Sequence, residues 1–254
     1  MADLKGLINQ KKLSIGSWIQ LPDVFSAEIM AKAGFDWLAI DIEHGLIDLN
    51  CAYKLIQIIG LSGSIPLVRL NENDPSAIRR VMDAGAGGVI IPMVNSEEDA
   101  RKALDAVKYP PVGKRSFGLG RAHKYGREFE SYIRKANESN IVVVQIEHVS
   151  VLDNLDSILN LEGIDACIIG PYDLSGSMGI PGKFNDKRFI AVLDKIIKAV
   201  KHSDKALGIH IVYPSESILK NRIAQGFKFV AYGMDTMFLS EAVSGVSRLK
   251  VRRR

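Results

Sequence analysis

Short runs of apolar residues alternate with longer segments of helical periodicity along the whole chain. Each run is too short for a buried helix, and several are rich in Val and Ile, which is typical of strands buried on both faces of a parallel sheet. The eight predicted strands are residues 14–19, 37–42, 66–70, 88–94, 141–146, 166–169, 207–212 and 228–231.

Amphipathic segments lie between these runs and predict helices at residues 24–33, 49–61, 75–84, 97–107, 151–158, 187–200 and 215–225. Gly34, Gly85 and Gly226 each follow such a segment, at the position where a helix ends before the next strand. Strand alternating with helix eight times predicts an α/β fold of the (β/α)₈ barrel type.

The chain of 254 residues shows no low-complexity linker and no change of composition, so residues 1–254 are predicted to form one barrel domain. The one long irregular stretch is "YPPVGKRSFGLGRAHKYG", within residues 95–140. A loop of this length in a compact domain is usually functional or disordered.

Composition excludes several classes of protein. Hydrophobic residues make up 47% and charged residues 24%, no apolar run is long enough to span a bilayer, and the first five residues lack a signal-peptide stretch. We therefore expect a cytoplasmic protein without a membrane partner. Cys51 and Cys167 lie in apolar contexts, which predicts reduced packing residues rather than a disulfide or a zinc site.

The net charge of +4 is modest, and part of it comes from the tail of Lys250 and Arg252 to Arg254. Without a basic stripe or an RNA-binding signature, this tail is predicted to be a solvated terminus, and no nucleic acid is expected as a partner. Small anionic substrates are compatible with this charge.

Polar residues gather where the predicted strands end, which is the end of a barrel that carries the active site. They are Asp41, Glu43 and His44 at the end of the second strand, Arg69 in the third, Gln145 and Glu147 at the fifth, and Gly170, Pro171, Tyr172 and Asp173 after the sixth.

Glu147 and Asp173 are 26 residues apart, one strand–helix unit, so we expect them at the same level on neighbouring strands, about 4.8 Å apart. Two carboxylates at that separation repel each other unless a cation lies between them. Hard oxygen ligands suit Mg²⁺ or Mn²⁺, which predicts a metal site with open positions for substrate. The alternative is that each acid caps a helix or lies in a loop.

Arg69 and His44 each have two explanations. Arg69 ends "IPLVRL" and either pairs with a neighbouring acid or clamps the oxygens of an anionic substrate. His44 is either structural or a catalytic base, and Asp41, three residues earlier, is placed to orient its imidazole across a turn.

Six motifs in order resemble one known family: "AIDIEHG", "PLVRL", "DAGAGGVIIPMV", "YPPVGKRSFG", "VQIEH" and "IGPYDLSGSMG". They are similar to the HpcH/HpaI aldolases, metal-dependent pyruvate aldolases that degrade hydroxylated 2-oxo acids. The resemblance runs from about residue 14 to 240. It implies a class II aldehyde-lyase that reversibly cleaves a 4-hydroxy-2-oxo acid to pyruvate and an aldehyde, with Mg²⁺, Mn²⁺ or Co²⁺ as cofactor.

The resemblance also implies a role for each site residue. Glu147 and Asp173 would bind the metal, Arg69 would stabilise the enolate oxygen, and His44 with Asp41 would move the proton of the aldol hydroxyl by way of a water molecule. The implied substrate contacts are Trp18, Gln145, Gly170, Tyr172, Val212 and Asp83.

Members of the family assemble as hexamers, described as trimers of dimers, so the resemblance implies a homo-oligomer. Asp83 would reach a neighbouring subunit's site, and the segment from about residue 234 to 254 would pack at a subunit interface. Tyr172 and Ser116 depart from the family's usual residues, so the resemblance does not extend to the identity of the aldehyde.

The chemistry agrees with a metal-dependent enzyme. Cleavage to pyruvate needs an electron sink, either a Schiff-base lysine or a Lewis-acid metal, and no predicted strand presents a lysine at its C-terminal end. Lys114 lies in the irregular loop. Two alternatives stay open: a citrate-synthase-like or other lyase that uses a non-aldehyde acceptor, and a barrel that binds an oxo acid without turnover. The oriented base argues against the second.

Overall fold

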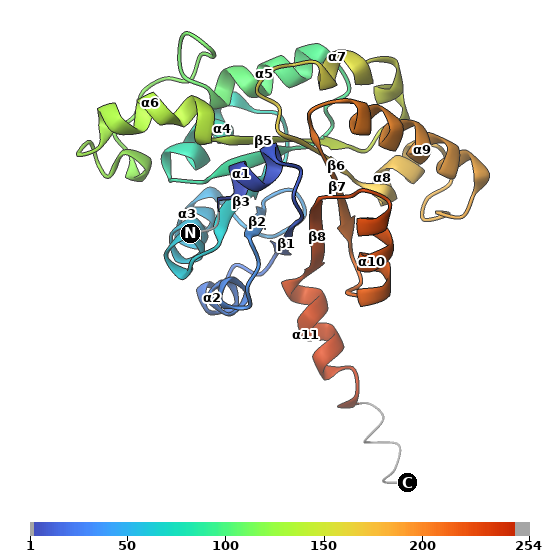
Figure 1. The fold of residues 1–254 in the computed structure, drawn as a ribbon. Coiled ribbons are helices and arrows are strands. Elements are labelled where there is room, and N and C mark those ends of the chain that lie inside the picture. The colour runs from blue at the N-terminus through green and yellow to red at the C-terminus, as the bar shows by residue number, and fades with distance from the viewer. Residues whose placement is uncertain (1–2, 247–254) are drawn as a thin grey trace.

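Eight parallel strands close into a barrel in a computed structural model that describes residues 3–246 (Figure 1). Each strand pairs with the next, and β8 pairs with β1. The strands are β1 Ser14–Ile19, β2 Trp37–Asp41, β3 Ile65–Arg69, β4 Gly88–Ile91, β5 Ile141–Ile146, β6 Ala166–Ile169, β7 Ala206–Ile211 and β8 Phe229–Met234. The predicted (β/α)₈ barrel is confirmed.

The predicted helices surround the barrel as α2 Val24–Lys32, α3 Leu49–Ser62, α4 Pro75–Asp83, α5 Glu97–Val107, α7 Leu155–Leu159, α9 Lys187–His202 and α10 Glu216–Ala224. The helix predicted at residues 151–158 was wrong in extent, because a 3₁₀ turn at Val149–Asp153 ends at Asn154 before α7 begins. Strand β4 ends three residues earlier than predicted, and β8 begins one residue later and ends three residues later than predicted.

Four helices and one further 3₁₀ turn were not predicted. They are α1 Leu4–Asn9, the turn at Arg121–His123, α6 Phe129–Ser139, α8 Pro171–Ser177 and α11 Asp235–Val243. Helix α1 begins with the Asp3 carboxylate accepting from the Gly6 amide at 2.9 Å, and its Leu4 and Ile8 join the core inside the barrel. This short helix therefore closes the end of the barrel opposite the mouth.

Side chains inside the barrel form a core of their own, separate from the layer between strands and helices. Trp37 stacks on Phe229 there, with ring centroids 4.3 Å apart. Because side chains alternate along a strand, the residue two positions after an inward apolar residue also points inward. Ala39 is thus followed by Asp41 and Leu67 by Arg69, so polar side chains gather at the C-terminal mouth.

Helix α11 extends away from the barrel beyond β8 (Figure 1), and its Leu239 and Val243 are exposed. Part of the segment predicted to pack at a subunit interface, and the basic tail of Lys250 and Arg252 to Arg254, lie outside the described residues. Cys167 is buried in the core and Cys51 packs against it, which confirms the predicted packing role, and burial raises the pKa of the Cys167 thiol to about 12. Within residues 3–246, no helix is long and apolar enough to cross a membrane.

Candidate active site

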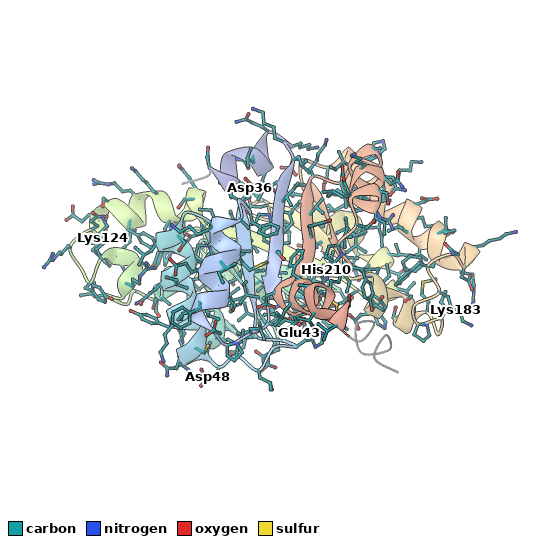
Figure 2. All side chains as sticks on the ribbon, turned by 90° about the horizontal axis from the view of Figure 1, so that it is seen from below. Asp36, Glu43, Asp48, Lys124, Lys183 and His210 are labelled. Atoms are coloured by element: carbon teal, nitrogen blue, oxygen red, sulfur yellow. The ribbon has the colours of Figure 1, made fainter. Side chains whose placement is uncertain are left out.

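A cavity of about 290 Å³ opens at the C-terminal mouth of the barrel. Figure 2 shows the molecule turned by 90° from Figure 1, with Glu43 and His210 in its central part and Lys124 and Lys183 toward opposite edges. The lining includes eight of the predicted site residues: Trp18, His44, Arg69, Gln145, Gly170, Tyr172, Asp173 and Val212. Asp41 and Glu147 are buried against this wall, through their contacts with Arg69 and Gln145.

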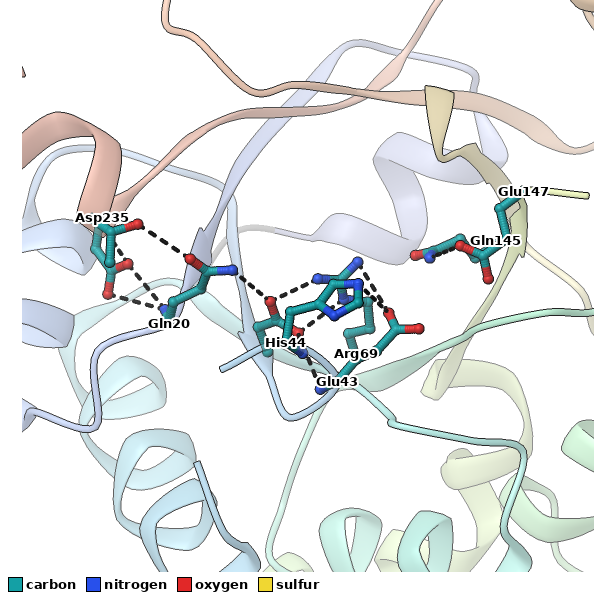
Figure 3. Close-up of polar contacts among 9 residues, drawn as sticks. Gln20, Glu43, His44, Arg69, Gln145, Glu147 and Asp235 are labelled. Atoms are coloured by element: carbon teal, nitrogen blue, oxygen red, sulfur yellow. Dashed lines mark hydrogen bonds and ion pairs between the residues drawn. The ribbon is translucent and has the colours of Figure 1, made fainter. Parts of the chain in front are cut away.

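Arg69 is held in one position by three neighbours. Its Nε and Nη2 donate to the two oxygens of Asp41 at 3.0 and 2.6 Å, and its Nη1 lies 3.1 Å from Glu43 Oε2 (Figure 3). The guanidinium also lies over the Trp18 ring, 4.3 Å from the centroid. Arg69 therefore pairs with neighbouring acids, as the first explanation predicted. It also lines the cavity, which the second explanation, a clamp on an anionic substrate, requires.

Asp41 does not contact the His44 imidazole, so the predicted orientation of that ring by Asp41 was wrong. The strand register places Asp41 directly beside Arg69, and the fully buried carboxylate binds the guanidinium instead. Its Oδ1 also accepts from the main-chain amides of Glu43 and His44, both at 3.1 Å. Burial acts to raise the pKa of Asp41, but Arg69, Gln20 and the His44 amide together outweigh it and the pKa is lowered. Asp41 thus stays ionised and fixes both Arg69 and the loop that carries His44.

The His44 side chain stands at the cavity entrance and is 59% exposed. Its Nε2 lies 3.9 Å from Glu43 Oε2 (Figure 3). Burial raises the pKa of Glu43, Arg69 lowers it, and the nearby Glu147 raises it further, with a net increase. Glu43 is therefore the acid that faces His44, Arg69 and Glu147 at once.

Glu147 is almost completely buried, and both its oxygens are bound. Oε1 accepts from the Met93 amide at 2.6 Å, and Oε2 accepts from the Gln145 side-chain amide (Figure 3). Burial raises the pKa of Glu147; the bonds from Gln145 and Met93 oppose this, and the charge of Asp173 adds to it. A buried carboxylate with a raised pKa that faces a second carboxylate is stabilised by a cation.

The predicted placement of Asp173 level with Glu147 was wrong. Ile146 pairs with Ile169, so the residue level with Glu147 is Gly170, and Asp173 lies in the first turn of α8. The two carboxylates still interact electrostatically. A Cβ on Gly170 would lie 3.3 Å from Glu147 Oε2, so a larger residue at this position would crowd that carboxylate.

These donors fit a hard divalent cation. They are carboxylate oxygens without a nearby cysteine, which suits Mg²⁺ or Mn²⁺ with several positions left to substrate and water. Within residues 3–246, no group of three or more His, Cys, Asp and Glu side chains is arranged to hold a metal ion. Glu147 and Asp173 would supply two carboxylates, which would leave the other metal positions to substrate and water.

Asp83 lies apart from this cavity, at the end of α4. Because each barrel helix runs back toward the start of the next strand, the end of α4 lies away from the mouth. Arg115, whose side chain is fully buried, donates to Asp83 Oδ1 at 2.6 Å. The predicted contact of Asp83 with a neighbouring subunit's site stays a prediction.

Two polar lining residues were missed by sequence reasoning, Gln20 and His210. Gln20 Nε2 donates to Asp41 Oδ2 at 2.9 Å, and the main-chain N–H of Gln20 donates to the Asp235 carboxylate (Figure 3). The alternation of side chains could have found both, because Gln20 follows the inward Trp18 by two positions and His210 follows the inward Ala206 by four.

Comparison with known proteins supports the same reading. A model of the HpcH/HpaI aldolase/citrate lyase family matches residues 14–242. The chain belongs to this family. It is 37% identical over 241 residues to the 2-keto-3-deoxy-L-rhamnonate aldolase of Escherichia coli K12, covering 94% of this chain and 89% of that protein. As an HpcH/HpaI family member it is an enzyme, as the motifs predicted.

Solved structures agree across almost the whole chain. An HpcH/HpaI aldolase/citrate lyase family protein from Burkholderia cenocepacia J2315 superposes with a TM-score of 0.92 at 26% identity, covering 99% of this chain and 100% of that one. The citrate synthase SbnG superposes with a TM-score of 0.87, also at 26% identity, covering 98% of each chain. Enzymes of the class II aldolase type in this family generally use a divalent metal.

Proposed function

We propose that this enzyme is a metal-dependent aldolase that reversibly cleaves a 4-hydroxy-2-oxo acid to pyruvate and an aldehyde. The observation that carries the proposal is a fixed cation, Arg69, on the wall of the cavity that also presents Gln145 and Asp173, with Glu147 buried behind Gln145. The family and its curated aldolase relatives support the reaction type.

The pyruvate half of the substrate is assigned to the β5 and β6 side of the cavity. Glu147 and Asp173 are the proposed metal ligands, and a divalent metal bound there would supply Lewis-acid polarisation of the keto oxygen. The main-chain amides of Tyr172 and Asp173 lie in the first turn of α8, and amides at a helix N-terminus favour a carboxylate. Gln145 fixes the Glu147 carboxylate through its amide group and lines the cavity beside it.

Arg69 is proposed to stabilise the negative charge that develops on the keto oxygen when the C3–C4 bond breaks. Its guanidinium is held by Asp41, Glu43 and Trp18, so it need not move as charge develops. A preorganised donor of this kind typically contributes a factor of about 10² to 10³ in rate.

His44 is proposed to take the proton from the C4 hydroxyl. The C3–C4 electron pair then moves to form the enolate, the C4 oxygen becomes the aldehyde carbonyl, and protonation at C3 gives pyruvate. In the structure the residue beside the imidazole is Glu43 rather than Asp41, so Glu43 is the acid that could stabilise its protonated form.

We also propose that the enzyme is a homo-oligomer. The exposed Leu239 and Val243 on α11 and the exposed Phe25 and Ile29 on α2 support this, because such apolar surface is usually covered. Asp83 is proposed to act at a neighbouring subunit's site. A trimer of dimers would give a mass six times that of the 27.9 kDa chain in solution.

The second candidate is a lyase or synthase that joins the pyruvate-type enolate to a 2-oxo acid. The citrate synthase SbnG shares the fold over 98% of the chain, which is why this candidate is kept. An acceptor assay separates the two. Metal-loaded enzyme is given pyruvate with glycolaldehyde, or pyruvate with oxaloacetate, and products are identified by mass spectrometry. Addition to the aldehyde supports the aldolase, and addition to oxaloacetate alone would overturn it.

A further inference from the structure

Met93 has an unusual backbone conformation for a residue other than glycine. Its φ is 51°, in the left-handed region that residues with a Cβ seldom adopt. Met93 lies two residues after the end of β4, at the mouth of the barrel, and it is half exposed. Burial of an exposed side chain does not explain why the chain takes a conformation here that glycine or asparagine adopts more easily.

The main-chain N–H of Met93 has a specific partner in the site. It donates to Glu147 Oε1 at 2.6 Å, across from the loop after β4 to the residue after β5. Because φ is the rotation about the bond from the amide nitrogen to Cα, its value sets how this N–H is turned relative to the chain that follows. The other Glu147 oxygen accepts from Gln145. The left-handed turn at Met93 therefore supplies one of the two donors that fix this buried carboxylate.

The residues around Met93 hold the turn in place. Pro92 and Val94, on either side of it, are buried. Asn95 Nδ2 donates back to the Met93 main-chain oxygen at 3.1 Å, and the Asn95 main-chain oxygen accepts from Asn154 Nδ2 at 3.0 Å. The loop after β4 is thus tied to the segment that follows β5. A strained conformation persists where the surrounding structure determines it in this way.

The other non-glycine residues of positive φ within residues 3–246 have an ordinary explanation. They are Lys11, Lys124 and Tyr125. Lys11 follows the end of α1, and Lys124 and Tyr125 follow the 3₁₀ turn at Arg121–His123. A left-handed residue is common where a helical segment ends. Met93 follows a strand instead, and strain that is maintained beside a functional site indicates a function.

We propose that Met93 is a positioning residue of the metal site, because its left-handed backbone holds its N–H on Glu147 Oε1 and keeps that carboxylate in one orientation for a divalent cation. This inference rests on the proposed function, in which Glu147 is a metal ligand. Outer donors that orient a ligand raise its affinity for the metal. The role belongs to the main chain, so it depends on how readily residue 93 adopts a positive φ.

Substitutions at residue 93 separate the backbone from the side chain. Asn adopts the left-handed region readily, whereas the β-branched Val rarely does. Mg²⁺ binding to metal-stripped enzyme is measured by isothermal titration calorimetry. We expect Met93→Val to weaken it about tenfold, as for loss of an outer donor, and the conservative Met93→Asn to stay within about twofold of the unmodified enzyme. At saturating Mg²⁺, Met93→Val should exchange the pyruvate methyl protons at close to the unmodified rate.

The matched control is Lys124→Val, which places the same β-branched residue at a φ of 48° on a residue that does not line the cavity. Both Val variants should unfold at a lower temperature, but only Met93→Val should lose Mg²⁺ affinity. Asn95→Ala removes the bond to the Met93 oxygen, should also weaken Mg²⁺ binding, and carries the test if Met93→Val does not fold. Unchanged Mg²⁺ affinity in both Met93→Val and Asn95→Ala, or an equal loss in Lys124→Val, would overturn the proposal.

Failure of this inference is distinguishable from failure of the proposed function. If Glu147→Gln binds Mg²⁺ as tightly as the unmodified enzyme, Glu147 is not a ligand, and the proposed metal site fails together with the role of Met93. If Glu147→Gln loses affinity while Met93→Val and Asn95→Ala keep it, the metal site stands and only the role of Met93 fails.

Discussion

Replacing Asp41 by Asn should release Arg69 while changing the side-chain shape very little. Asp41 Oδ1 accepts from Arg69 Nε and from two main-chain amides, and an Asn carbonyl can keep these three bonds. The Asn amide group would then face Arg69 Nη2 and Gln20 Nε2, which are both donors. The variant therefore loses the hydrogen bonds from Arg69 Nη2 and Gln20 Nε2, and the Asn N–H group faces each of these donors.

The magnitude follows from burial. The Asp41 side chain is fully buried and that of Arg69 is 11% exposed, so solvent screens this pair little. Removing one partner of a buried ion pair costs about 3–5 kcal/mol. The contact of Arg69 with Glu43 at 3.1 Å remains and limits the loss. We therefore expect Asp41→Asn to lower the free energy of unfolding by roughly 3 kcal/mol at pH 7, near the lower bound for such a pair.

The pH dependence has a definite sign. Because the pKa of Asp41 is lowered in the folded protein, its stabilising contribution is fully present above the pKa of an unfolded Asp, about 3.9. It is lost as the pH falls through the folded pKa. The difference between the unmodified enzyme and Asp41→Asn should therefore be largest near neutral pH and should shrink below about pH 4.

Urea denaturation at pH 7 and at several lower pH values measures this difference, with Asp194→Asn on the exposed face of α9 as the control. The control should change stability by less than about 0.5 kcal/mol. An Asp41→Asn variant as stable as the control at pH 7, or a difference that grows as the pH falls, would refute the reasoning.

Three further predictions concern the site and the barrel interior. Glu147→Gln should weaken Mg²⁺ binding by isothermal titration calorimetry at least tenfold, while the exposed Glu138→Gln should not; equal affinities would remove Glu147 as a ligand. His44→Ala should lower kcat for aldol cleavage by about 10² to 10⁴ and keep Mg²⁺ affinity, and an unchanged kcat would remove it as the base. Gly16→Ala should destabilise the barrel by about 1–3 kcal/mol in thermal unfolding, because the new Cβ would lie 2.0 Å from the Trp37 ring; a neutral effect would contradict the packing.

The barrel was predictable because its signal is repeated eight times, and each short Val- and Ile-rich run differs clearly from the amphipathic segment that follows it. Residues at strand ends were predictable for the same reason, since the fold fixes which end carries the site. This brought Arg69, Gln145 and Gly170 to the cavity without knowledge of any contact.

What the sequence did not reveal depends on contacts between strands and on short helices. Asp41 is three residues from His44 but pairs across the sheet with Arg69, and only the register of β2 on β3 decides between them. Asp173 lies in α8, a helix of 7 residues. The main sequence feature that indicates this helix is Pro171 at its first position. Helix α1 has 6 residues, too few for periodicity to show.

The central claim is that this site makes an enolate from pyruvate when a divalent metal is bound. Proton exchange of the pyruvate methyl group in D₂O, followed by NMR, tests it without knowledge of the aldehyde. The enzyme is stripped of metal and then given Mg²⁺, Mn²⁺ or Co²⁺, with Asp173→Asn alongside. We predict exchange that requires a metal and is lost in Asp173→Asn. The account would be contradicted if none of the three metals raised the exchange rate above that of the metal-free enzyme. It would also be contradicted if Asp173→Asn exchanged the methyl protons as fast as the unmodified enzyme.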